Sequence, residues 1–279
     1  MDATTSFSSQ VFITSKKSTP RLFILTGKGG TGKTTLAMSL TLALQKEKRK
    51  VFYLAFDQTT DTKTCRDLKI PFIVQIQKEI TLDYVSDKLG SRIVANWILE
   101  TAFFKALYQM LPGIIYLILI SDVLKRLEQD KDLHIVLDLP SSGHALTLFE
   151  APHNFRALFE RGPLFEDLKR IQKELLNPKE TKLYICSLAT ELSYNEAQEL
   201  KEQLTELEVS EPEIIFNNSL VPLNLNEKKL APILKKKVKQ ENKVISLGQE
   251  EGIETILPFI AQAKNKDRIE ALVQEWSRL

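Results

Sequence analysis

The segment Gly27–Thr35, GKGGTGKTT, is the strongest indication of the fold class. It meets the pattern G-x-x-x-x-G-K-[ST], and it follows the short apolar run Arg21–Thr26, RLFILT. The apolar residues of the next segment, Lys33–Lys48, fall on one helical face. A strand, a glycine-rich loop and a helix in this order form a phosphate-binding loop. Its glycines let backbone N–H groups converge on phosphates, and the helix N-terminus adds positive charge.

The side chains of this loop predict how it would hold a nucleotide. Lys33 can reach the terminal phosphates, and the hydroxyl of Thr34 can ligate Mg²⁺, a hard cation that prefers oxygen. The expected cofactors are therefore ATP and Mg²⁺. The loop residues expected to contact the nucleotide are Gly27, Lys28, Gly29, Gly30, Thr31, Gly32, Lys33, Thr34 and Thr35.

Apolar strands alternate with helices along the chain. Such alternation predicts an α/β fold with a doubly wound, mostly parallel sheet covered on both faces, here as one domain over residues 1–279. The expected strands are Arg21–Thr26, Val51–Phe56, Ile135–Leu137, Leu183–Leu188, Ile214–Phe216 and Val244–Leu247. After the first helix, further helices are expected at 155–159, 165–176, 194–207 and 267–279.

Two segments stand outside this alternation. Residues 1–18 are polar and are expected to form a loose arm, in which Val11–Ile13 could add a short strand. Residues 78–130 are expected to form a helical insert that caps the sheet. Its aromatic and aliphatic side chains could belong to the core or to a surface that meets a client or a membrane. The run Gly113–Ile120 is too short to cross a bilayer.

Composition excludes several classes of protein. The chain is 43% hydrophobic and 27% charged with a net charge of +2, so its mild basicity does not indicate nucleic acid as a partner. Cys65 and Cys186 lie far apart and outside any C-x-x-C pair, which argues against a disulfide framework or a zinc or iron–sulfur site within one chain. The N-terminus lacks the pattern of a signal peptide. A reducing, cytoplasmic location is expected.

The loop also resembles a particular class. K-G-G-x-G-K-T is the deviant Walker A motif of the MinD, ParA, nitrogenase iron protein and ArsA classes. In those classes the early lysine reaches across a dimer interface, so the resemblance gives Lys28 that role here, catalytic together with Lys33. The segment Ile135–Pro152 resembles switch II of the ArsA family, which includes arsenite pumps and ATPases that target tail-anchored proteins. Asp138, Gly143 and His144 match, and Pro140-Ser141 stands where the family has Ala-Pro.

The same resemblance implies roles for three further residues. Asp138 would hold Mg²⁺, through water. Asn217, at the end of IIFNN, would bind adenine, and an asparagine terminating a strand is the alternative. Asp57 would position the attacking water as a catalytic residue. The family's proline after that aspartate is replaced by Gln58, which puts the rate of hydrolysis in question. His144 could be a packed histidine or have a catalytic role.

The function implied by the resemblance is an ATP-hydrolysing dimeric switch coupled to a hydrophobic protein or membrane client. The partner subunit would be a second copy or a related ATPase. Two alternatives stay open: a nucleotide-binding regulatory subunit with weak or no hydrolysis, and a metalloid-extrusion ATPase. Two cysteines cannot supply a three-sulfur metalloid site in one subunit. The basic run Lys228–Lys239 could be a solvated helix face or a contact for acidic lipid or nucleic acid.

Overall fold

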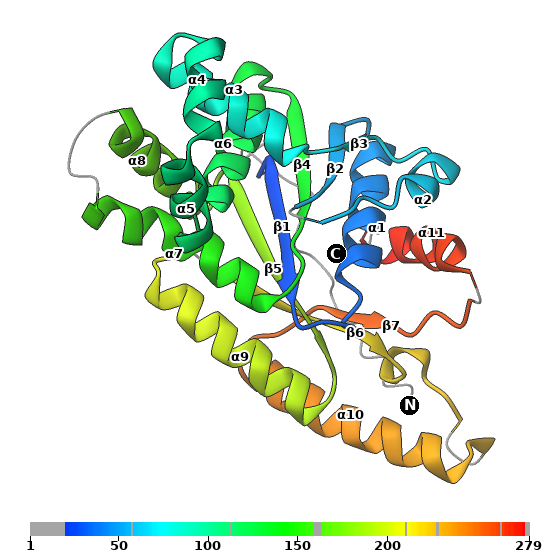
Figure 1. Ribbon diagram of the computed structural model, residues 1–279. Helices are drawn as coiled ribbons and strands as arrows, with labels where there is room; N and C mark the ends of the chain where they lie inside the picture. Colours follow the sequence, from blue (N-terminus) through cyan, green and yellow to red (C-terminus); the bar gives the residue numbers. More distant parts are fainter. Residues whose placement is uncertain are drawn as a thin grey trace.

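The centre of the protein is a seven-stranded sheet in which the paired strands of the described residues all run parallel (Figure 1). The computed structural model describes residues 20–56, 58–111, 113–158, 163–209, 211–226, 229–262 and 264–276. The strand order is β3-β2-β4-β1-β5-β6-β7. The strands are β1 Leu22–Gly27, β2 Lys50–Ala55, β3 Phe72–Ile73, β4 Leu133–Asp138, β5 Thr181–Leu188, β6 Glu213–Ser219 and β7 Ile256–Pro258. The expected α/β fold is confirmed.

Helices cover both faces of the sheet. The helices are α1 Lys33–Lys46, α2 Thr62–Asp67, α3 Gln77–Leu89, α4 Arg92–Glu100, α5 Ala102–Met110, α6 Gly113–Gln129, α7 Ser142–Leu158, α8 Pro163–Leu176, α9 Glu191–Glu206, α10 Pro232–Glu250 and α11 Asn265–Trp276, with a 3₁₀ turn η1 at Val221–Leu223. Successive residues of β1 point to opposite faces. Leu22 and Ile24 pack with α6 to α10, and Phe23 and Leu25 pack with α1, α2 and α11. Figure 1 shows these two helical layers on either side of the sheet.

The expected helical insert between β2 and β4 is confirmed as helices α3 to α6. Its side chains divide between the two roles that the sequence left open. The apolar run at the start of α6, Ile115–Ile120, is buried, and all of it except Ile118 belongs to the core that lies on β1 and β4. Helices α4 and α5 instead expose Ile93, Trp97 and Phe103, whose relative accessibilities are 85%, 71% and 77%. The insert is therefore core on its sheet side and apolar surface on its outer side.

Two expected elements are wrong or incomplete. Val244–Leu247 is not a strand, because it lies in the middle of α10, where Val244 and Ile245 are buried on one side of the helix. The last strand is instead β7, an edge strand that ends in Pro258, a residue that interior strands exclude. The helix expected from Phe155 is the end of α7, which begins at Ser142.

Several expectations fall outside the described residues. These are the arm with its strand at Val11–Ile13, the catalytic residue Asp57, residues 159–162 and the last residues of the C-terminal helix. Among the residues that the structure describes, no helix has both the length and the apolar character needed to cross a membrane.

Candidate nucleotide-binding site

The glycine-rich loop leaves the sheet at the carboxyl end of its central strand. Strand β1 lies between β4 and β5, and the chain turns to one side of β1 for β2 and to the other for β5. In open α/β sheets the crevice at such a switch point is where ligands bind. The ends of β1, β4 and β6 carry Gly27, Asp138 and Asn217, so three of the predicted site residues meet at this edge.

Two glycines of the loop are required by close approach of other strands. Gly27 has φ 134°, and a Cβ atom there would lie 2.2 Å from the carbonyl oxygen of Cys186 on β5. Gly32 has φ 91° and caps α1, and its Cβ atom would lie 2.4 Å from Nδ2 of Asn217. Any side chain at either position would displace backbone or the Asn217 amide. The loop thus packs closely against Cys186 of β5 and Asn217 of β6.

Lys33 is the first residue of α1, and it is buried behind the loop. Its Nζ donates a hydrogen bond to the carbonyl oxygen of Lys28 over 3.0 Å, and Thr31 Oγ1 donates to the same oxygen over 2.9 Å. Burial lowers the pKa of Lys33, while the charge of Asp138 acts in the opposite direction. The ammonium of Lys33 therefore lies beneath the loop. Phosphate groups bound by the loop would stabilise this buried positive charge.

The predicted magnesium ligands lie next to each other. Asp138 is fully buried at the end of β4, opposite Leu25 of β1 and Ala55 of β2. Burial raises the pKa of its carboxyl, and the neighbouring hydroxyls of Thr34 and Tyr53 act to lower it.

Within the described part of the chain, Oδ1 of Asp138 is buried without a hydrogen-bond partner. Hydroxyl and carboxylate oxygens are the ligands that Mg²⁺ prefers, and an orphaned carboxylate oxygen beside Thr34 fits a water of its coordination shell. Sequence reasoning missed Tyr53, because a tyrosine within a buried strand looks like ordinary core.

Asn217 contacts the loop rather than standing clear of it. Its Nδ2 donates a hydrogen bond to the carbonyl oxygen of Thr31 over 2.8 Å. Its Oδ1 is buried and finds no partner among the residues described. The Nδ2 group of the amide thus supports the loop, and its Oδ1 is left to accept a further hydrogen bond. Adenine binding by Asn217 stays a prediction.

The segment around the predicted catalytic residue Asp57 is held at the end of β4. Asp57 itself is not among the described residues, but its neighbours are. The backbone N–H of Phe56 and the side-chain Nε2 of Gln58 both donate to the carbonyl oxygen of Asp138, over 3.0 and 2.9 Å. The side chain that replaces the family's proline therefore links the segment after β2 to the segment that resembles switch II. A proline has no donor for this bond.

His144 packs against the insert. The hydroxyl of Tyr116 on α6 is hydrogen-bonded to Nδ1 of His144 on α7. The Tyr116 ring also lies 5.5 Å from the ring of Phe56, centroid to centroid. Of the two roles left open for His144, this geometry supports the packed histidine.

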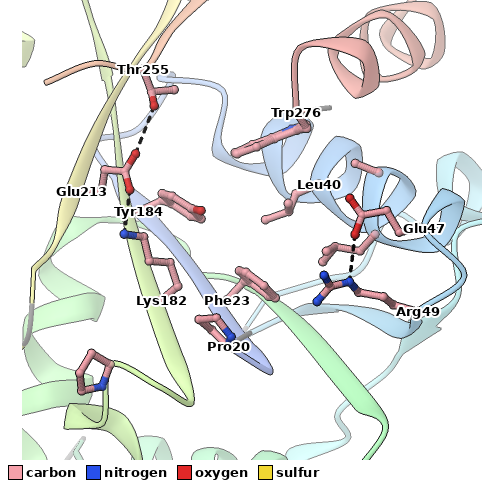
Figure 2. Close-up of a pocket in the computed structure, with 13 residues that line it drawn as sticks. Pro20, Phe23, Leu40, Glu47, Arg49, Lys182, Tyr184, Glu213, Thr255 and Trp276 are labelled. Carbon is pink, nitrogen blue, oxygen red and sulfur yellow. Dashed lines mark hydrogen bonds and ion pairs between the residues drawn. The ribbon is translucent and has the colours of Figure 1, made fainter. Parts of the chain in front are cut away.

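A separate apolar cavity of about 200 Å³ lies at the opposite, amino-terminal ends of the strands (Figure 2). Phe23, Leu40 and Trp276 line it, and its rim carries the ion pairs Lys182–Glu213 and Arg49–Glu47. This cavity is distinct from the loop and contains none of the predicted site residues.

Comparisons with known proteins find similarity to proteins named as ATPases. The model of the family described as Nephrocystin 3, N-terminal, a P-loop NTPase-related domain, matches residues 4–138. The ATPase BagA of Mycobacterium tuberculosis is 26% identical over 253 residues, which cover 82% of this chain and 73% of BagA. A protein of Plasmodium berghei named ATPase ASNA1 homolog is 25% identical over 251 residues, 75% of this chain and 66% of the relative. The chain is therefore a distant homologue of the BagA and ASNA1 ATPases of the ArsA family, with the α/β fold of a P-loop NTPase.

Proposed function

We propose that this protein binds ATP with Mg²⁺ and hydrolyses it as a cytoplasmic, dimeric switch. The observation that carries the proposal is the buried carboxylate of Asp138, next to Thr34, whose Oδ1 is left without a partner among the described residues. In this proposal Lys33 and the loop N–H groups hold the phosphates. Thr34 ligates the metal directly, and Asp138 holds one of its waters. The bound Mg²⁺ would neutralise charge on the β- and γ-phosphates.

Nucleotide binding is tested by Lys33→Ala. The substitution removes the cation that would lie between the terminal phosphates, so the rise in melting temperature that Mg-ATP causes in the wild type should be lost. Lys46→Ala is the matched control, because Lys46 is the exposed last residue of the same helix. An unchanged stabilisation of Lys33→Ala by Mg-ATP would refute the assignment of the loop.

Dimerisation is proposed from Lys28, whose side chain is half exposed at the start of the loop. There a lysine can leave its own subunit for the phosphates of a second copy, or of a related ATPase subunit. Phosphate charge shared by two subunits favours the closed dimer only while nucleotide is bound. Light scattering with Mg²⁺ and the non-hydrolysable analogue AMP-PNP should show dimers for the wild type. Lys28→Ala should bind the analogue but close at higher concentrations and turn over slowly.

The client is proposed to be hydrophobic. Ile93, Trp97, Phe103 and Met110 are each more than two-thirds exposed on the outer helices α4 and α5. An apolar surface of this kind is typical of sites that meet a protein or a membrane. Serine at both Ile93 and Trp97 should weaken the binding of a fluorescently labelled apolar peptide, and serine at the exposed Leu192 of α9 is the control. Equal binding by both variants would exclude this surface.

A regulatory subunit with weak hydrolysis is the second candidate, and Gln58 favours it. Its hydrogen bond to the carbonyl oxygen of Asp138 restrains the segment that is expected to position the attacking water. Single-turnover measurement of ATP hydrolysis separates the two candidates. A wild type that binds ATP and shows no turnover as a dimer would favour the regulatory function.

A further inference from the structure

The ammonium of Lys28 is paired within its own subunit. Lys28 Nζ forms an ion pair with Oε1 of Glu196, a residue 168 positions later in the chain. Glu196 lies on α9, which follows β5, the strand that runs beside β1. Lys28 of the glycine-rich loop is therefore bound to α9 of its own subunit, the helix that follows β5.

The carboxylate of Glu196 depends on this pair. Its Oε2 is buried and has no hydrogen-bond partner in the described part of the chain. A carboxylate that has one desolvated oxygen is stabilised by whatever cation its other oxygen contacts. Lys28, in contrast, is half exposed and keeps part of its hydration. The pair therefore matters more to Glu196 than to Lys28, which a stronger anion could attract away.

We propose that Glu196 is a positioning residue that holds Lys28 in the nucleotide-free subunit and sets the nucleotide concentration needed for the dimer to close. The inference rests on the proposed function, in which Lys28 reaches the phosphates of a second subunit. Triphosphate oxygens carry more negative charge than one carboxylate and can take Lys28 from Glu196. Closure of the dimer then requires the Lys28–Glu196 ion pair to break. The pair therefore opposes closure until ATP is bound.

The experiment is a light-scattering titration of the full chain with AMP-PNP in the presence of Mg²⁺. Glu196→Gln keeps the shape of the side chain and removes its charge. Half-maximal closure should then need about three- to ten-fold less AMP-PNP, the range for loss of a partly exposed, charge-assisted pair. Glu199→Gln is the matched control, an exposed glutamate of the same helix, and it should leave the midpoint where it is.

The Lys28→Ala background separates positioning from a merely structural effect. There Glu196→Gln should not move the midpoint, because the pair no longer exists. An equal shift in that background, or no shift in the wild-type background, would overturn the inference. Glu196→Asp, which keeps the charge but shortens the side chain, should shift the midpoint in the same direction by less and decides the question if Glu196→Gln does not fold.

The outcomes also distinguish the inference from the proposed function. A wild type that neither binds AMP-PNP nor closes would refute the proposed function itself. A wild type that closes, with Glu196→Gln closing at the same concentration, would refute only the role of Glu196.

Discussion

The hydroxyl of Tyr53 donates a hydrogen bond of 2.9 Å to Oδ2 of Asp138. Both residues are buried, and they lie on adjacent strands of the sheet. Burial alone disfavours the charged carboxylate and raises the pKa of Asp138. The Tyr53 hydroxyl acts in the opposite direction, because a donated hydrogen bond stabilises the ionised form. Tyr53 thereby occupies one carboxylate oxygen, whereas the other, Oδ1, has no hydrogen-bond partner among the described residues.

Removal of this hydroxyl by Tyr53→Phe should lower the free energy of unfolding by about 1–3 kcal/mol, the cost of losing a buried hydrogen bond to a charged group. It should also raise the Mg²⁺ concentration at which ATP binding is half-maximal, since Asp138 would be less readily ionised. Urea denaturation at neutral pH measures the first effect, and titration of Mg²⁺ at fixed ATP measures the second.

A double-mutant cycle with Asp138→Asn isolates the pair. The coupling energy between Tyr53 and Asp138 should be of the same order as the single loss, about 1 kcal/mol or more. Additive effects of the two substitutions would show that Tyr53→Phe destabilises the protein through packing instead.

Asn217→Ala should lower both the affinity for ATP and the preference for ATP over GTP. Its Nδ2 donates a hydrogen bond to the loop at Thr31, and its Oδ1, which has no partner in the described part of the chain, is the acceptor predicted to meet the adenine amino group. Competition binding with the two nucleotides measures both quantities, and Asn195→Ala, on the exposed side of α9, is the control. A fall in affinity with an unchanged ATP preference would assign Asn217 to the loop alone.

The two cysteines should be inert in the folded protein. Burial raises the pKa of the Cys65 thiol to about 11 and that of Cys186 to about 12. The nucleophile is the thiolate, and a raised pKa keeps both groups protonated at mildly alkaline pH. Iodoacetamide should leave both thiols unmodified in the native state and alkylate both in guanidinium chloride. Rapid native modification of either residue would contradict the burial that the structure gives it.

The sequence predicted what depends on local pattern. The strand, loop and helix from Arg21 to Lys48 were recognisable because spacing and apolar periodicity carry them. The strand expected at Val244–Leu247 is wrong, because a short apolar run fits a strand or a helix equally well when its packing partner is unknown. In the structure Val244 and Ile245 belong to the same buried cluster as Phe216, whose ring lies against Gly248 of the same helix.

Contacts between distant segments could not be predicted in this way. Three such contacts join residues that only the sheet topology brings together. They are the contacts of Tyr53 with Asp138, Gln58 with Asp138, and Lys28 with Glu196. Asp138 and Asn217 were placed by resemblance, and the structure puts both at the loop. The ligand that each residue would bind depends on the charges and polar atoms around it, and sequence spacing does not give these.

Asp57→Asn should bind ATP as the wild type does and lose turnover by at least about 100-fold, because an amide can neither accept a proton from water nor hold it as firmly in line. Asp61→Asn is a matched control. Asp61 caps α2 by accepting a 3.0 Å hydrogen bond from the Thr64 N–H, and asparagine caps a helix equally well. Single-turnover hydrolysis and AMP-PNP binding, measured on both variants, separate chemistry from affinity. Equal rates for Asp57→Asn and the wild type would remove Asp57 from the reaction. A loss shared by Asp61→Asn would place the effect in the whole segment that follows β2, the segment that Gln58 fastens to Asp138.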